Sequence, residues 1–341
     1  MRVLITILSL VFSLNSVAQI VNGTIFNEKK IPLSDADVYL DGTTISATSD
    51  KEGHFSLDYN YEANNVLVIS CPGYQTIFLS SFDSKKELNI LMKPLLNKLN
   101  EVVITRNDKF TRKEKLQLFR RFFLGETINA LNTFIQNEDD IYFKYDKENY
   151  ILKAFSDKPL IILNTSLGYK INYELVTFEV NFNSLSVKPD NAVKCLYQGF
   201  SRFVETNNSN EVLAKREKTF QGSQVHFFRD LSNNILGKDK FLIYSNQLAV
   251  NPNTCFKVIK EGEDLIKVEI LPQKAQKLDK GVFASFDIEY DDREQSKIIF
   301  ETNTFYIYKY GNNSNIGSIT FLGDMSEKKM GDTLPLNYGI L

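Results

Sequence analysis

The chemistry that this sequence can perform is limited first by its histidines. It contains two, His54 and His226, among 341 residues. A hydrolytic zinc site usually needs two histidines and a glutamate, often beginning as His-x-x-Glu. The third residue after His54 is Leu57 and the third after His226 is Arg229, so neither histidine begins that pattern. Three scattered cysteines form no thiolate cluster either. We therefore predict no metal site and no cofactor.

Nucleophilic serine chemistry has one weak candidate. The pattern Gly-x-Ser-x-Gly is absent, and Gly222-Ser223 with His226 nearby is the serine and histidine pairing that merits consideration. A triad needs a base that reaches the hydroxyl and a carboxylate that orients the base, which Asp230 could supply on paper. At a spacing of three residues we instead expect a local hydrogen bond or a helix cap. We predict no catalytic residue and no enzymatic activity.

Phosphate and calcium sites are also poorly supported. No Gly-x-Gly-x-x-Gly occurs, and Gly237-Lys238 lacks the upstream glycine of a P-loop. The acid pairs at 139–140 and 291–292 could each contribute to a calcium site, but calcium takes six to eight oxygen ligands. We interpret both pairs as solvated turns.

Tyr306, Tyr308 and Tyr310 fall on one face of a predicted strand. On an exposed face they would form a stacking surface for a sugar or a peptide. Against a core they would be ordinary packing, which is the interpretation we prefer.

Composition and charge narrow the class of protein. The formal net charge is −2, without the basic surplus of a nucleic-acid binder. Aromatic residues make up 12%, with 26 Phe, 16 Tyr and no Trp, which favours a β-rich fold. The odd number of cysteines allows at most one disulfide. Buried free thiols are the simpler interpretation, and a bridge between Cys195 and Cys255 stays open.

The first 18 residues have the order of a secretory signal peptide. Arg2 precedes an apolar run from Val3 to Leu14, and small residues at 16–18 precede Gln19. The run is shorter than the ~20 residues that span a membrane. The first cysteine, Cys71, lies too far along for a lipid anchor. We predict cleavage after Ala18 and export to the periplasm or the outer membrane.

Residues 19–93 read as a small all-β sandwich. Short apolar runs recur at roughly ten-residue spacing, separated by turn signals such as the segment 50–53. The motifs Gly23-Thr24-Ile25, Pro32-Leu33-x-x-Ala36-x-Val38-x-Leu40, Thr48-x-x-Lys51-x-Gly53-x-Phe55 and Ile69-Ser70-x-x-Gly73-Tyr74 resemble the carboxypeptidase regulatory-like domain. This resemblance implies a transthyretin-like sandwich, common in exported proteins of Bacteroidota. It implies no peptidase activity.

Residues 94–136 are predicted to be a linker and a helical connector. The stretch 99–105 is similar to the segment that follows the same sandwich in TonB-dependent transporters, although the chain is too short for a transporter barrel. Thr111 and Glu114 fit a capping box, and apolar residues at helical spacing follow, with Gly125 as a break. The region 106–121 is basic, which indicates a solvated helix face or peripheral contact with anionic lipid.

Residues 137–341 are predicted to be a larger antiparallel β-rich domain, without βαβ alternation. The segment 311–315 is predicted to join strands 304–310 and 317–322 as a hairpin. The segment 207–210 is predicted to be a surface loop. The motifs Asn164-x-x-Leu167-Gly168-Tyr169, Gly222-Ser223-x-x-His226-Phe227-x-Arg229-x-Leu231 and Gly331-Asp332-x-Leu334-Pro335-x-Asn337-Tyr338 resemble the C-terminal part of exported Bacteroidota proteins that carry the regulatory-like domain.

These observations favour a non-enzymatic exported envelope protein that binds or assembles an unidentified envelope protein, peptide or glycan. One alternative is an enzyme, or an enzyme accessory, acting on envelope peptide or glycan, which clustered carboxylates with raised pKa values in a deep pocket would favour. A second is a partner of a TonB-dependent transporter, for which the stretch 99–105 is the cue.

Overall fold

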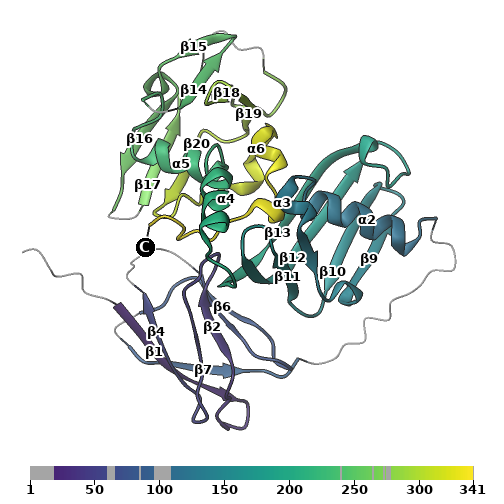
Figure 1. Cartoon of the computed structure of the whole chain (residues 1–341), viewed down its shortest axis with the longest axis vertical. Helices are drawn as coiled ribbons and strands as arrows, with labels where there is room; N and C mark the ends of the chain where they lie inside the picture. Colours follow the sequence, from purple (N-terminus) through teal and green to yellow (C-terminus); the bar gives the residue numbers. More distant parts are fainter. Residues whose placement is uncertain are drawn as a thin grey trace, which may run out of the picture. The chain divides into compact units, whose positions relative to one another are not determined.

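The computed structural model (Figure 1) is mainly β, as the aromatic content predicted. It describes residues 19–59, 66–83, 86–95, 109–238, 240–262, 265–271, 273 and 278–340. The predicted signal peptide, residues 1–18, and the transporter-like stretch 99–105 lie outside the described residues. The chain divides into two compact units, one of residues 1–41 and 45–97, the other of residues 42–44 and 98–341. Each is described by itself.

The first unit contains two small sheets. The strands of the first sheet are, in spatial order, β4 (His54–Tyr59), β1 (Gln19–Asn27) and β7 (Leu88–Met92). Those of the second are β3 (Ser46–Thr48), β2 (Asp37–Leu40), β5 (Leu67–Ser70) and β6 (Ile77–Leu79). Val21, Ile25 and Leu57 of the first sheet are fully buried, as are Val38 and Ile69 of the second. The predicted β-sandwich is confirmed.

The predicted turn at 50–53 connects β3 to β4. The Asp50 side chain accepts hydrogen bonds from the backbone amides of Glu52 and His54, at 3.0 and 2.8 Å. Gly53 has φ +78°, and a Cβ added there would lie 2.6 Å from the carbonyl oxygen of Ile25. Only glycine fits this left-handed position without displacing the neighbouring strand.

The second unit begins with a helix-covered sheet, which we call the first layer. Its six strands are β8 (Thr133–Ile135), β11 (Leu160–Asn164), β12 (Tyr169–Phe182), β10 (Ile151–Ser156), β9 (Ile141–Asp146) and β13 (Ala192–Glu205). Strand β13 pairs along the whole of β12, and every pairing is antiparallel. The helices are α2 (Arg112–Phe123) and α3 (Ile128–Leu131), separated at Gly125 as predicted.

Helix α2 was predicted as part of a connector, and it also contributes side chains to the core of this layer. Phe119 and Phe123 are fully buried, and their rings lie 4.6 Å from Phe178 and 5.1 Å from Tyr173, centroid to centroid. The predicted capping box is confirmed: the Thr111 hydroxyl accepts from the Glu114 amide, and the Glu114 carboxylate accepts from the Thr111 amide. The boundaries predicted at 93/94 and 136/137 stay predictions.

A second layer follows, built from two further sheets. One has the order β15 (Leu248–Val250), β14 (Phe241–Ser245), β18 (Ala284–Tyr290), β19 (Glu294–Phe300), β21 (Ile319–Gly323). The other has the order β16 (Phe256–Lys260), β17 (Leu265–Ile270), β20 (Thr304–Tyr308). The remaining helices are α4 (Asn210–Phe220), α5 (Gln224–Ser232) and α6 (Asp324–Glu327).

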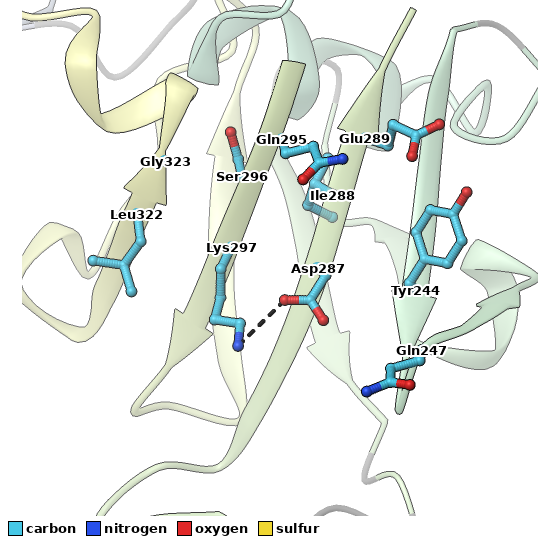
Figure 2. Close-up of a pocket in the computed structure, with 10 residues that line it drawn as sticks. All are labelled: Tyr244, Gln247, Asp287, Ile288, Glu289, Gln295, Ser296, Lys297, Leu322 and Gly323. Atoms are coloured by element: carbon cyan, nitrogen blue, oxygen red, sulfur yellow. Dashed lines mark ion pairs between the residues drawn. The ribbon is translucent and has the colours of Figure 1, made fainter. Parts of the chain in front are cut away.

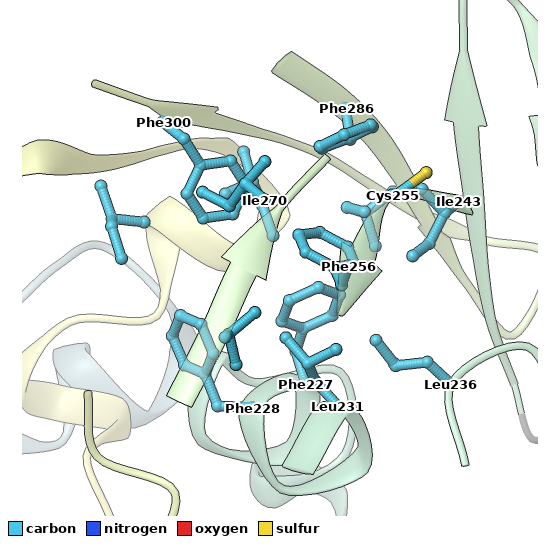
Figure 3. Close-up of a cluster of buried hydrophobic side chains, with 14 of the residues drawn as sticks. Phe227, Phe228, Leu231, Leu236, Ile243, Cys255, Phe256, Ile270, Phe286 and Phe300 are labelled. Carbon is cyan, nitrogen blue, oxygen red and sulfur yellow. The ribbon is translucent and has the colours of Figure 1, made fainter. Parts of the chain in front are cut away.

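The core of the second layer is rich in phenylalanine (Figure 3). Phe227 and Phe228 enter it from α5, and Phe256, Phe286 and Phe300 enter it from the strands. All five side chains are at most 2% exposed. Because the strands pair antiparallel throughout this layer, the prediction of antiparallel sheets is confirmed.

The predicted hairpin over 304–322 is wrong. Strand β20 pairs with β17, whereas β21 pairs with β19 in the other sheet. The intervening segment folds back on β20 through a bridge between Ile307 and Asn313, and Asn315 adopts the left-handed conformation at φ 58°. The chain therefore crosses from one sheet to the other at the point where a tight turn was expected.

Five short 3₁₀ turns complete the described secondary structure: Glu138–Asp140, Pro189–Asn191, Pro252–Thr254, Ile316–Ser318 and Met330–Asp332. The predicted loop at 207–210 is a loop up to Ser209, after which α4 begins at Asn210. In the described part of the chain, no helix has both the length and the apolar character needed to cross a membrane.

Candidate functional site

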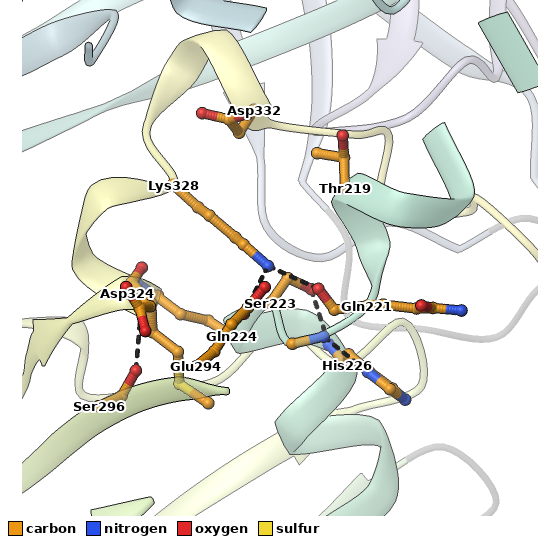
Figure 4. A network of polar contacts seen from close by, with 12 residues as sticks. Thr219, Gln221, Ser223, Gln224, His226, Glu294, Ser296, Asp324, Lys328 and Asp332 are labelled. Carbon is orange, nitrogen blue, oxygen red and sulfur yellow. Dashed lines mark hydrogen bonds and ion pairs between the residues drawn. The ribbon is translucent and has the colours of Figure 1, made fainter. Parts of the chain in front are cut away.

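Ser223 and His226 lie at the start of α5 (Figure 4), where their geometry is that of a helix cap. The Ser223 hydroxyl accepts a hydrogen bond from the backbone amide of His226 at 3.1 Å. His226 Nδ1 accepts from the Gly222 amide at 3.2 Å, and Nε2 lies 3.7 Å from Asp230 Oδ2. Both ring nitrogens thus face groups other than the serine hydroxyl. The predicted cap is confirmed, and this cluster lacks the contact that a Ser-His nucleophile needs.

Lys328 is the centre of the polar network shown in Figure 4. Its ammonium donates to the carbonyl of Gln221 at 2.5 Å and to the carboxylate of Glu294 at 3.2 Å. Its side chain is only 17% exposed. These bonds join the residue that follows α6, the turn before α5 and strand β19.

A hollow of about 240 Å³ lies beside this network, and we call it the Arg229 hollow. Its charged lining residues are Arg229, Lys328 and Asp332. Apolar walls come from side chains such as Phe220 and Leu334. The first turn of α5 lines it as well, since Ser223, Gln224 and Val225 belong to the same wall.

Arg229 joins α5 to two distant parts of the chain. Its guanidinium donates to the backbone carbonyls of Tyr310 at 3.0 Å, Tyr338 at 2.8 Å and Leu336 at 2.7 Å. It also lies over the ring of Phe220, 4.9 Å from the centroid. Burial lowers the pKa of Arg229 to about 10, which leaves it charged at neutral pH.

Asp332 also lines this hollow and is held by two hydrogen bonds. Its carboxylate accepts from the Thr127 hydroxyl at 2.7 Å and from the Asn129 side-chain amide at 2.8 Å. Burial raises the pKa of Asp332 above its ordinary value, against the lowering effect of these two bonds and of the Lys328 charge.

A second, more open hollow of about 460 Å³ lies on the outward face of the five-stranded sheet (Figure 2). We call it the sheet basin. It is lined by polar and aromatic side chains: Tyr244, Gln247, Asp287, Glu289, Gln295 and Lys297.

The strand register arranges these side chains in rows. Tyr244 lies opposite Asp287, Asp287 opposite Lys297, and Lys297 opposite Leu322, so one row crosses four strands. Lys297 and Asp287 form an ion pair at 3.3 Å, drawn in Figure 2. At ~4.8 Å between neighbouring strands, this row extends over roughly 14 Å.

The inward face of the same strands makes the basin floor rigid. Residues next to the row, including Phe286, Ile288 and Ile298, are at most 2% exposed and belong to the phenylalanine core. Because successive side chains of a strand point to opposite faces, a dense core on one side holds the strand backbone from which the outward side chains project.

Other residues singled out by the sequence have structural roles. Tyr306 and Tyr308 lie on the face of β20 opposite the buried Phe305 and Ile307, and both are half-buried. The preferred interpretation, packing against a core, therefore fits Tyr310, which is 3% exposed, and not the other two.

The acid pairs lie in turns and short helical segments. Asp140 pairs with Lys158 at 2.8 Å, and this bond contributes most to lowering the pKa of Asp140. Asp291 and Asp292 occupy the turn between β18 and β19 with φ values of 53° and 55°. No group of three potential ligands is close enough to hold a metal ion within the described ranges.

The three cysteines are free thiols, and the bridge considered between Cys195 and Cys255 does not form. Burial raises the pKa of all three, that of Cys195 to about 11. They therefore remain protonated thiols at neutral pH, the weakly reactive form.

The basic region 106–121 is described from Lys109 onward, and its arginines are engaged within the protein. Arg112 donates to the carbonyls of Ile141 and Glu138. Arg120 pairs with the Glu138 carboxylate, and Arg121 pairs with Glu126 at 2.9 Å. Contact of this region with lipid stays a prediction.

Sequence reasoning did not single out Arg229, Lys328 or Asp332 as site residues. Arg229 and Asp332 occur in two motifs of the C-terminal resemblance, Arg229 was otherwise noted only as the residue that rules out a zinc motif at His226, and Lys328 is in neither motif. Their segments are far apart in the sequence and meet through the folding of the C-terminal segment onto α5. The basin residues carried the ordinary alternation of a strand, which does not distinguish a binding face from a solvated one.

Comparison with known proteins identifies the first unit. Residues 21–104 match the family model described as the CarboxypepD_reg-like domain. That model describes the regulatory-like domain and not a catalytic carboxypeptidase domain. No curated protein matches the chain.

Among solved structures, two mutants of a type II cohesin–X-dockerin complex from Acetivibrio cellulolyticus are similar over 22% of the chain, at 26% and 27% identity and TM-scores of 0.20 and 0.19. The matched part spans 58% and 56% of those chains. A DUF3823 family protein from Bacteroides ovatus is similar over 56% of this chain and 82% of its own, at 12% identity and a TM-score of 0.19. The family match, which covers the motifs Gly23 to Tyr74 that suggested it, identifies residues 21–104 as a CarboxypepD_reg-like domain.

Proposed function

We propose that this is a non-enzymatic, exported protein of the periplasm or outer membrane that binds an envelope glycan or peptide in the sheet basin. The observation that carries the proposal is the row of Tyr244, Asp287 and Lys297 across a sheet with a close-packed core behind it. The regulatory-like domain fits this proposal, because that domain suggests a binding or regulatory module.

The basin chemistry favours a polar, extended ligand. A half-buried tyrosine such as Tyr244 offers an aromatic face for a sugar ring or a peptide side chain. The carboxylates of Asp287 and Glu289 accept hydrogen bonds, and the side-chain amides of Gln247 and Gln295 both donate and accept. A row of roughly 14 Å matches about four residues of an extended peptide at ~3.3 Å each.

The enzyme alternative has less support. Its predicted signature was a cluster of carboxylates with raised pKa values in a deep pocket. Asp332 has a raised pKa, but it is the one carboxylate among the residues that line the Arg229 hollow. Acid–base catalysis on a glycan normally uses a pair of carboxyl groups.

The test is co-sedimentation of the purified protein with peptidoglycan sacculi. We expect Tyr244→Ala and Asp287→Asn each to lower the bound fraction several-fold, because each removes one contact of the row. Lys257→Ala is the control, since Lys257 pairs with Glu269 on the other sheet of the same layer. Equal binding by all variants would place the ligand site outside the basin.

Export has its own test. We expect deletion of residues 1–18 to keep the protein in the cytoplasm, as measured by cell fractionation with periplasmic and cytoplasmic markers. Unchanged location after this deletion would contradict the assignment of the segment as a signal peptide.

A further inference from the structure

The Arg229 hollow is separate from the sheet basin and shares no lining residue with it. It contains two cationic side chains, Arg229 and Lys328, and one carboxylate, Asp332. From this arrangement we propose that the hollow is a second binding site, which takes a small zwitterion such as an amino acid or a dipeptide. The ligand carboxylate would contact the two cations and the ligand ammonium would contact Asp332.

Arg229 supplies positive charge that the protein does not neutralise. Its three hydrogen-bond acceptors are backbone carbonyls, and no carboxylate of the described residues forms an ion pair with it. A guanidinium has five N–H donors, so three bonds leave two of them available. A charge in a partly buried position without a counter-ion is costly. An anionic group entering the hollow would supply the missing counter-ion.

Lys328 strengthens this anionic preference. Among the described residues its ion-pair partner is Glu294, which is 38% exposed and does not line the hollow, whereas Lys328 does. The first turn of α5 faces the same space, and a helix N-terminus carries partial positive charge. Arg229 and Lys328 thus both line the hollow, where a ligand carboxylate would accept a charge-assisted hydrogen bond from each.

Asp332 would bind the ammonium group of the proposed ligand. Its neighbours Thr127 and Asn129 fix the carboxylate by donating to separate oxygens. Because burial disfavours the ionised form of Asp332, a cationic group placed beside it would be stabilised by the carboxylate and would stabilise it in return.

The size and walls of the hollow limit the ligand. About 240 Å³ equals the space of roughly eight water molecules at ~30 Å³ each. Phe220, Leu334 and Pro335 form apolar walls, which suit a small apolar side chain such as that of alanine. A long polymer does not fit in this volume. The ligand of the hollow therefore differs from the extended glycan or peptide proposed for the sheet basin.

The experiment is isothermal titration calorimetry of the whole protein with L-alanyl-L-alanine and two blocked forms of it. N-acetylation removes the ammonium charge, and C-terminal amidation removes the carboxylate. We expect the free dipeptide to bind, and each blocked form to bind about ten-fold more weakly or worse, because each loses charge-assisted hydrogen bonds. Equal affinity for all three probes, or no binding of the free dipeptide at millimolar concentration, would overturn the proposal.

Variants assign the effect to the hollow. Lys328→Met is expected to weaken binding of the free dipeptide about ten-fold, and Lys328→Arg to restore it to within a few-fold. The control is Lys257→Met, which removes a more exposed lysine–glutamate pair, 3.1 Å to Glu269, at a residue that does not line the hollow. Unchanged affinity in Lys328→Met, with the near-ultraviolet circular dichroism also unchanged, would refute the site.

Co-sedimentation with sacculi separates this proposal from the proposed function. Lys328→Met should leave sacculus binding unchanged, and Tyr244→Ala should leave dipeptide binding unchanged. Loss of both activities in either variant would contradict the existence of two independent sites.

Discussion

The two layers of the second unit use the same construction, in which a helix places two phenylalanines on an antiparallel sheet. In the first layer, Phe119 and Phe123 of α2 face the sheet, and Arg120 and Arg121 near its C-terminal end pair with carboxylates. In the second, Phe227 and Phe228 of α5 face the core, whereas Arg229 is bound by carbonyls of other segments.

This difference explains why the Arg229 hollow lies beside α5 and not beside α2. Arg120 and Arg121 of α2 are partly exposed and paired with carboxylates, so solvent screens their charges. The polar face of α5 is covered by the chain around Tyr310 and by the C-terminal segment, so its charge is held where the dielectric constant is lower. A helix whose second face is also enclosed can build a polar site.

Truncation of the core phenylalanines gives the largest expected effect. Phe123→Ala and Phe227→Ala should each lower the free energy of unfolding by about 3–5 kcal/mol, because both side chains are fully buried. The chain after β21 links the two layers, since Met325 packs in the second core and Met330 in the first. We therefore expect one shared transition in guanidinium for the second unit. Two transitions, each shifted by one variant, would break the comparison.

Arg229→Met gives the next largest effect and tests the difference between α5 and α2. It leaves three carbonyls without their donor, and we expect a loss of about 3 kcal/mol in unfolding free energy. The matched change on α2 is Arg121→Met, which removes an exposed pair with Glu126 and should cost about 0–1 kcal/mol. Similar losses in thermal or chemical unfolding would show that the enclosure of α5 is unimportant.

The sequence predicted α2 and missed α5 for a physical reason. Helix α2 is 12 residues long, with a capping box and apolar residues spaced for one buried face. Helix α5 has only nine residues and two adjacent phenylalanines, so its short apolar run cannot be distinguished from a strand by spacing alone. Its Ser223 cap was the available signal, and the sequence did indicate a cap there.

Sheets were predicted better than their connections. The alternation in β18 and β19 was visible, because alternate residues such as Phe286 and Ile288 face the core. Which strands pair is decided by contacts between distant segments, and the error at β20 and β21 came from assuming that neighbours in sequence pair. The residues of the Arg229 hollow were missed for the same reason, since they come from α5 and the C-terminal segment.

The helix caps give a smaller test of the same pair of helices. Thr111→Ala and Ser223→Ala each remove a side-chain acceptor from the first turn and should cost about 1 kcal/mol in unfolding free energy. Ser223→Ala is additionally expected to weaken dipeptide binding, since the first turn of α5 lines the hollow. Thr111→Ala serves as the control that should leave this binding unchanged.

The smallest effect is a pH dependence that only the α2 cap should show. The Thr111 amide and hydroxyl donate to the Glu114 carboxylate and hold its pKa below the ordinary value. A lowered pKa in the folded state means a contribution that is present above the pKa of the unfolded chain and is lost as the pH falls through the folded value. The stability gap between wild type and Glu114→Gln should therefore be largest at neutral pH and close in acid.

The cap of α5 has no acidic residue in its first turn, so the gap between wild type and Ser223→Ala should stay constant over that acidic range. If the stability difference between wild type and Glu114→Gln persists in acid, it does not come from the charge of Glu114. The pH dependence would then not distinguish the start of α2 from the start of α5.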